Sequence, residues 1–220
     1  MKDMNNNGFS SEDIIKVLDA LYQRTIDGIG VINSCSVSQM ADDYLLEYCN
    51  PQIACRKMLK YQIAKCTTSG VISGFGGVLT MPVAIPANIC NVLYVQMRMV
   101  ACTAYMAGFD LHSDQVQTLV YACLAGVSIT SVVKQSGIKA GSKLAIKAIE
   151  RIPGKTLTKF NQKIGFRFIT KFGEKGIVNL GKLVPGVGAV INGGVDYFET
   201  KAIGNRAFKM FFESDCPEDC

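Results

Sequence analysis

Basic side chains at a four-residue spacing are the strongest chemical signal in this sequence. Between residues 139 and 175, a lysine or an arginine occupies every fourth position without a miss. On an α-helix a step of four residues rotates by only about 40° around the axis, so such a series stays on one flank. A row of cations on one flank is suited to binding negatively charged groups. The series consists of Lys139, Lys143, Lys147, Arg151, Lys155, Lys159, Lys163, Arg167, Lys171 and Lys175.

The distribution of charge also indicates a negatively charged partner. The net charge is +5, but the segment 134–182 holds twelve Lys and Arg against Glu150 and Glu174, a local charge of +10, while the rest of the chain carries −5. We therefore expect the partner to be anionic membrane lipid or a membrane protein complex. Specific binding of nucleic acid is not expected, because the sequence has no recognition helix, zinc module or aromatic-studded sheet.

Apolar residues accompany the basic series, each one position after a basic residue. They are Leu144, Ala148 and Ile152, followed by Phe160, Ile164, Phe168 and Phe172. An apolar stripe bordered by Lys and Arg is typical of a helix that lies at the lipid headgroup interface. The same stripe is equally typical of a helix packed on a protein core with its charges in water. Periodicity alone leaves these two alternatives open.

A smaller group of charges lies in the apolar middle of the chain. Arg98, Asp110 and Asp114 are the only formal charges between Cys66 and Val133, and we name them as a candidate polar cluster. The two aspartates flank His112, the only histidine. This arrangement favours a polar turn over a catalytic base.

Sequence patterns that resemble catalytic or cofactor sites fail in detail. Gly154-Lys155-Thr156 ends like a phosphate-binding loop, but the required glycine would fall at Ile149 and the preceding segment is predicted to be helical. The nine cysteines are odd in number and mostly lie in apolar stretches, so we interpret them as reduced thiols of a cytoplasmic protein, most of them core residues. We expect no catalytic residues, no cofactor and no metal site. A hydrolase whose polar groups converge only after folding is the third hypothesis.

Sequence signals for helices recur along the whole chain. No segment shows the sustained alternation of apolar and polar residues that is typical of a β-strand. Ser10 with Asp13 forms a capping-box pattern, and Asn50-Pro51 is a strong start signal. The first expected helix begins at Ser10 or Ser11, and the third runs from Pro51 towards Gly70. The other expected helices cover about Ser38–Tyr48, Pro86–Gly108, about Asp114–Gln135, about Ile138–Ile152, about Thr156–Phe172 and about Ala189–Phe212. The sequence thus predicts an all-α fold, a compact bundle of about seven to nine helices.

Two long stretches without charge define the middle of this bundle. Residues 66–97 and 115–133 contain no charged side chain, and runs of 18 or more apolar residues are ordinarily candidates for membrane spans. Glycines, prolines and polar residues dilute the first run. We therefore expect the 66–133 region to form a buried, hydrophobic central hairpin, and leave open whether it enters a bilayer.

Several collinear motifs give the chain a resemblance to the EcsC protein family over about residues 50–212. The motifs are Gly74-Phe75-Gly76-Gly77, Pro82, Ile85-Pro86, Val95-Gln96-Met97-Arg98-Met99, Gly108-Phe109-Asp110, Cys123-Leu124-Ala125-Gly126, Ile164-Gly165-Phe166-Arg167, Thr170-Lys171-Phe172-Gly173, Lys175-Gly176, Asn179-Leu180-Gly181-Lys182, Val184-Pro185 and Thr200-Lys201 with Ile203-Gly204. The family is named after a bacterial protein encoded beside an ATP-driven transporter. The resemblance implies a bacterial, membrane-linked setting and supplies no catalytic residues.

Together these patterns divide the chain into three parts and suggest a role. Residues 1–9 are expected to be a disordered tail, 10–212 a single helical domain, and 213–220 an acidic tail that contains cysteines. We expect a non-enzymatic protein that docks on the anionic inner membrane through its basic helix pair, as an accessory to a membrane complex or as a bilayer-perturbing effector. It would be cytoplasmic and peripheral at that membrane. The alternative is a soluble helical module that binds a protein or a hydrophobic ligand.

Overall fold

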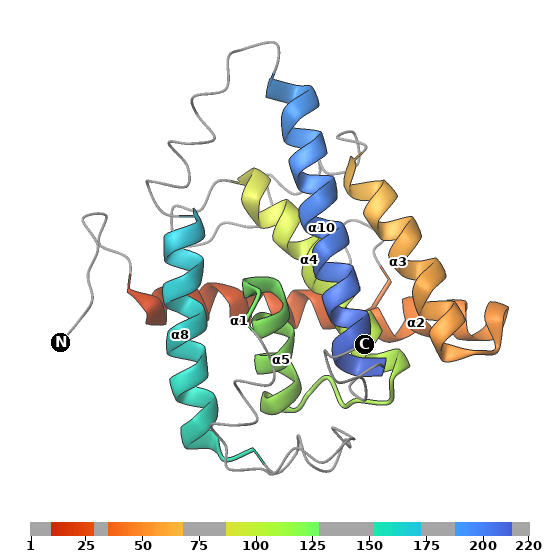
Figure 1. The fold of residues 1–220 in the computed structure, drawn as a ribbon. Helices are drawn as coiled ribbons and strands as arrows, with labels where there is room; N and C mark the ends of the chain where they lie inside the picture. The colour runs from red at the N-terminus through yellow and green to blue at the C-terminus, as the bar shows by residue number, and fades with distance from the viewer. Residues whose placement is uncertain (1–9, 29–34, 68–86, 128–151, 173–187, 213–220) are drawn as a thin grey trace, which may run out of the picture.

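The fold is all α-helical in the residues that the structure, a computed structural model, describes: 10–28, 35–67, 87–127, 152–172 and 188–212. Seven helices are present there, and they form one compact bundle (Figure 1). They are α1 (Ser11–Asp27), α2 (Val37–Tyr48), α3 (Pro51–Thr67), α4 (Ala87–Met106), α5 (Asp114–Ala125), α8 (Gly154–Phe172) and α10 (Gly188–Phe212). The predicted all-α bundle is confirmed. The expected tails, 1–9 and 213–220, and the predicted basic helix at 138–152 lie outside the described residues, apart from Ile152.

Local signals in the sequence explain where the first three helices begin. The Ser10 side chain accepts a hydrogen bond from the Asp13 backbone while the Asp13 carboxylate accepts one from the Ser10 backbone, which completes a capping box. Ser36 and Gln39 form the same pair of bonds at α2. At α3 the Asn50 side chain accepts from the backbone N–H groups of Gln52 and Ile53.

Helix α5 ends ten residues earlier than the predicted Gln135. Gly126 adopts a left-handed backbone conformation with φ of 68°. Glycine adopts this conformation readily because the residue has no Cβ. The Gly126 N–H bonds to the Cys123 carbonyl and the Val127 N–H to the Ala122 carbonyl, the two bonds of a Schellman motif. The prediction was wrong because the apolar residues continue past Gly126 and periodicity gave no reason to stop there.

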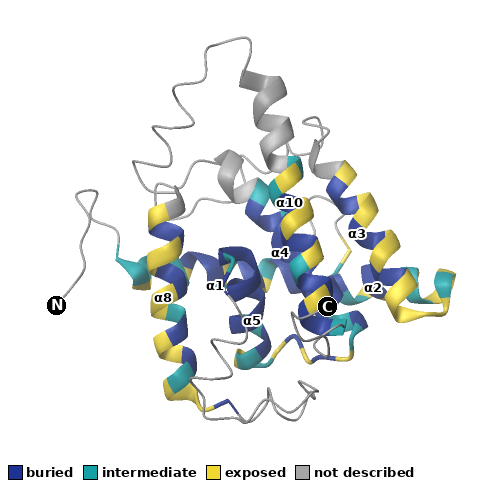
Figure 2. Ribbon diagram, viewed as in Figure 1, coloured by how far each residue is buried: buried dark blue, intermediate teal, exposed yellow. Residues whose placement is uncertain are grey.

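Helices α4 and α5 form the centre of the bundle. Helix α4 packs against α1, α2, α3, α5 and α10, and α5 is buried along most of its length (Figure 2). A buried hydrogen bond of 3.0 Å from Gln96 to Thr200 joins α4 to α10. No described helix is both long enough and apolar enough to cross a bilayer.

Helix α8 lies at the edge of the bundle, where it packs on α1 and α5 (Figure 1). The contact with α1 is close at Gly165, because a Cβ added there would lie 2.6 Å from the Ser11 carbonyl oxygen. Figure 2 shows the opposite side of α8 as a row of exposed residues. Among the described helices, only α1 and α5 make extensive contact with α8, so its other side is not covered by them.

Candidate functional site

The apolar stripe of α8 belongs to the protein core. Phe160, Ile164 and Phe168 of this stripe are buried together with the neighbouring Leu157, with exposed fractions between 0 and 6%, and the side chain of Phe172 is not described. They pack towards α1 and α5, so the stripe is already covered by protein. Of the two alternatives that periodicity left open, these side chains follow the second, a helix packed on a protein core. They are not free to enter a lipid headgroup layer.

The basic residues of α8 lie on the opposite, exposed face. Lys155, Lys159, Lys163 and Arg167 are all exposed, and α8 contains no Asp or Glu. None of these four side chains forms a salt bridge with another described residue. We call these four residues the basic face of α8. Of the other predicted residues, Lys171 lies in α8 but its side chain is not described, and Lys139, Lys143, Lys147, Arg151 and Lys175 lie outside the described residues.

An aromatic side chain that the sequence analysis did not select lies within this basic face. Phe166 is 51% exposed although it is a large apolar residue. It follows Lys163 by three positions and Lys159 by seven, spacings that place residues on the same side of a helix. A helical projection of α8 would have separated Phe166 from the buried stripe. The basic face therefore combines four cations with one exposed ring.

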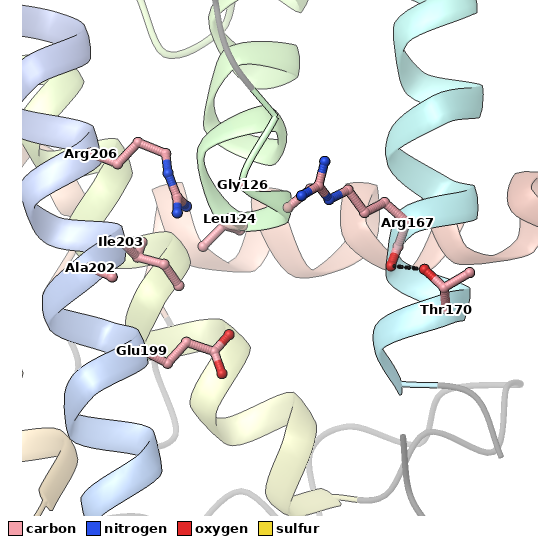
Figure 3. Close-up of a pocket in the computed structure, with 9 residues that line it drawn as sticks. Leu124, Gly126, Arg167, Thr170, Glu199, Ala202, Ile203 and Arg206 are labelled. Atoms are coloured by element: carbon pink, nitrogen blue, oxygen red, sulfur yellow. Dashed lines mark hydrogen bonds between the residues drawn. The ribbon is translucent and has the colours of Figure 1, made fainter. Parts of the chain in front are cut away.

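A pocket of about 370 Å³ opens beside this face, at the C-terminal end of α5. Its polar side chains are Arg167 and Thr170 from α8 and Glu199 and Arg206 from α10, and its apolar wall includes Leu124. In Figure 3 the two guanidinium groups extend from opposite sides towards Gly126. The Thr170 hydroxyl donates a hydrogen bond to the Arg167 backbone carbonyl at 2.9 Å. The cationic donors of the pocket are the guanidinium groups of Arg167 and Arg206.

Arg206 is held in place by the end of α5. Its guanidinium donates a hydrogen bond to the Cys123 carbonyl, one of the last carbonyls of that helix. These carbonyls carry the negative end of the helix dipole, so a cation there is stabilised. On α10, residues 199, 202, 203 and 206 recur at helical spacing and turn one face towards the pocket. Nothing in the sequence marked Arg206, because its partner lies 83 positions away.

The structure places the candidate polar cluster in two different environments. Arg98 is buried, with 8% exposure, and donates hydrogen bonds to the Tyr94 hydroxyl and to the backbone carbonyl and sulfur of Cys35. Asp110 and Asp114 are both exposed, in the turn after α4 and in the first turn of α5. Asp110 accepts from the His112 backbone N–H at 2.9 Å, which is the geometry of a polar turn.

The buried thiols have the properties of core residues. Burial raises the pKa of the Cys55 thiol to about 11 and that of the Cys123 thiol to about 12. A raised thiol pKa disfavours the thiolate that nucleophilic catalysis requires. Among the described residues, no three His, Cys, Asp or Glu side chains are grouped so as to hold a metal ion.

Comparison with known proteins identifies a family over nearly the whole chain. The model of the EcsC protein family matches residues 14–212. The match includes every described helix apart from the first three residues of α1. No curated protein and no solved structure matches the chain.

Proposed function

The chain belongs to the EcsC protein family, and from this premise we propose that it is a non-enzymatic protein that docks on an anionic membrane surface through the basic face of α8. The observation that carries the proposal is a set of four exposed cations on α8, a helix at the edge of the bundle that contains no Asp or Glu. The proposed location is the cytoplasmic side of a bacterial inner membrane, as a peripheral protein that assists a membrane complex or perturbs the bilayer.

The expected strength of this docking follows from the number of charges. Attraction to an anionic leaflet contributes about 1 kcal/mol for each Lys or Arg near the surface, so the basic face supplies about 4 kcal/mol. The effect falls as salt screens the charges. Phe166 adds an apolar contact that salt does not screen, because its ring is exposed on the same face.

Burial of the α8 stripe changes the mechanism that the sequence suggested. Because Phe160 and Ile164 fill the core, docking does not use the whole apolar side of the helix. The proposal is therefore electrostatic attraction of a folded surface, with one aromatic anchor. It requires no unfolding of α8 from α1 and α5.

The test is flotation of the full chain with neutral and anionic vesicles at low and high salt. We expect binding only to vesicles that contain phosphatidylglycerol, and only at low salt. Reversing Lys155, Lys159 and Lys163 to Glu should abolish it. The matched control reverses Lys57, Lys60 and Lys209, three exposed lysines of α3 and α10, and changes the net charge by the same amount.

The control separates a docking face from a general effect of charge. The proposal predicts that the control variant still floats with anionic vesicles. Equal loss in both variants would mean that overall charge drives the binding, and no flotation of the unaltered chain would favour a soluble module that binds a partner protein. Either result would overturn docking through α8.

A further inference from the structure

We propose that the pocket at the C-terminal end of α5 binds a phosphomonoester group between the guanidinium groups of Arg167 and Arg206. This adds a ligand of defined chemistry to the basic face. It rests on the docking proposal only where the phosphomonoester is carried by a lipid. The same chemistry could come from a soluble phosphate ester, and the experiment below separates these two sources.

The position of the two arginines is the first support. Helix α5 packs against both α8 and α10, and the two guanidinium groups reach its end from opposite sides (Figure 3). The hydrogen bond to Cys123 fixes Arg206 before any ligand arrives. A fixed donor loses less conformational freedom on binding than a free side chain does. Arg167 is exposed and forms no ion pair with a described residue, so its donors can turn towards a ligand.

Charge and donor geometry favour a phosphomonoester over a carboxylate. Such a group carries a charge of about −1.5 to −2 at neutral pH and three strong acceptor oxygens. Two guanidinium forks that approach from two sides can share these oxygens, whereas a carboxylate has two oxygens and is satisfied by one arginine. The formal charges of the lining side chains, Arg167, Arg206 and Glu199, leave one positive charge for a ligand to neutralise.

Glu199 limits where the anion can lie. It precedes Arg206 by seven residues on the same helix, a separation of roughly 10 Å along the axis. The phosphomonoester is therefore placed between the two guanidinium groups, away from the carboxylate. The last carbonyls of α5 also disfavour an anion, and the Arg206 guanidinium that is bonded to Cys123 offsets this effect. Repulsion by Glu199 weakens binding, so removal of its charge should strengthen binding.

The size of the pocket fits a small headgroup. Its volume of about 370 Å³ lies at the lower end of the range of about 300–1,000 Å³ that small-molecule pockets occupy. Arg167, which lines the pocket, is exposed and belongs to the basic face proposed to meet the membrane. Leu124 and Ile203 add an apolar wall for the carbon atoms next to the phosphate.

The first experiment is isothermal titration of the full chain with inorganic phosphate, and with acetate as the carboxylate probe. We expect saturable binding of phosphate and none of acetate. Arg167→Gln and Arg206→Gln should each weaken phosphate binding at least about tenfold, as loss of a charge-assisted hydrogen bond does. Glu199→Gln should tighten it. Lys60→Gln removes one exposed charge on α3, outside both the pocket and the basic face of α8, and should leave the affinity unchanged.

Further variants protect this test against loss of folding. Arg206→Gln removes the cap of α5, so Arg206→Lys, which keeps the charge but not the fork, should also weaken binding while leaving the melting temperature closer to that of the unaltered chain. Arg167→Gln touches no described helix cap. Equal weakening by Lys60→Gln and Arg167→Gln would overturn the proposal, because it would indicate an effect of general surface charge. Absence of saturable phosphate binding by the folded chain would overturn it as well.

The second experiment distinguishes the source of the phosphate and separates this proposal from docking. Vesicles of phosphatidic acid, a phosphomonoester, are compared with phosphatidylglycerol vesicles of equal surface charge. A preference for phosphatidic acid that disappears in Arg167→Gln supports a lipid ligand. Phosphate binding in solution without that preference supports a soluble ester. Docking on phosphatidylglycerol through Lys155, Lys159 and Lys163 can fail while phosphate binding persists.

Discussion

The hydroxyl of Tyr22 on α1 donates a hydrogen bond of 2.9 Å to the backbone carbonyl of Leu111, in the turn between α4 and α5. Both residues are buried, and they are 89 positions apart in the chain. The Tyr22 ring also meets the Tyr121 ring edge to face, with centroids 5.8 Å apart. One side chain therefore fixes α1 to α5 and to the turn before it, and α1 and α5 are the two helices on which α8 packs.

Replacing Tyr22 with Phe should lower the free energy of unfolding by about 1–3 kcal/mol, because it leaves a buried carbonyl without its donor. Urea denaturation followed by circular dichroism measures this change. Tyr61→Phe is the control, since Tyr61 is 58% exposed and its change should stay within about 0.5 kcal/mol. Equal effects of the two substitutions would contradict the importance of the Leu111 bond.

Adding a methyl group at Gly165 should also destabilise the fold. The new Cβ would lie 2.6 Å from the Ser11 carbonyl oxygen, so α8 and α1 must move apart, at a cost of about 1–3 kcal/mol. Gly154→Ala, in the same helix, meets no atom within 4 Å and should be nearly neutral. Thermal melting of the two variants compares them directly. The close approach of α8 to α1 would be refuted if Gly165→Ala melted at the same temperature as Gly154→Ala.

Much of the fold could be predicted because its signals are local. Ser10 with Asp13 and Asn50 with Pro51 predict helix starts from residues within one turn, and these helices begin as expected. Gly165 and Arg206 show the limit of this approach. Their partners, Ser11 and Cys123, lie far away in the chain, so spacing alone does not reveal a close helix contact or a side chain that caps a distant helix end.

The candidate site was predictable in part for the same reason. The basic face follows from a four-residue period within one helix, and its described members are exposed as a helical flank requires. The pocket depends on α5, α8 and α10 meeting, and Arg206 belongs to no periodic series in the sequence. Phe166 was overlooked because the apolar stripe was defined by its position after a basic residue, whereas Phe166 stands before Arg167.

Alkaline pH should destabilise the protein because buried thiols favour their protonated form in the folded state. The pKa of Cys55 is raised by burial from 9.0 to about 11, and the pKa of Cys123 is raised by burial to about 12. The unfolded chain loses these protons first, so the stability is fully present below about pH 9 and declines as pH rises towards 11. Each thiol contributes a slope of up to about 1.4 kcal/mol per pH unit.

Denaturation curves at pH 8, 9 and 10 test this expectation, with Cys55→Ala as the informative variant. Its unfolding free energy should be lower than that of the unaltered chain at pH 8 because of lost packing, but should fall less steeply between pH 9 and 10. Burial also raises the pKa of Tyr22 and Tyr121, which adds to the decline in both proteins. A parallel decline in the variant and the unaltered chain would exclude Cys55 as a source of the pH dependence.

The exposed ring of Phe166 should contribute to membrane binding in a way that salt does not affect. Burying a Phe side chain fully contributes about 1.5–3 kcal/mol, and about half of this ring is still exposed in the protein. Phe166→Ala should therefore weaken partition into phosphatidylglycerol vesicles by about 1 kcal/mol, roughly fivefold. Leu46→Ala is the matched control, because Leu46 is 81% exposed and belongs to α2, a helix that lies on the other side of the bundle from α8 (Figure 1). Measured across a salt series, the Phe166→Ala ratio should stay constant while the effect of Lys159→Gln shrinks as salt rises. A larger loss with Leu46→Ala than with Phe166→Ala would place the membrane contact on α2 and contradict docking through α8.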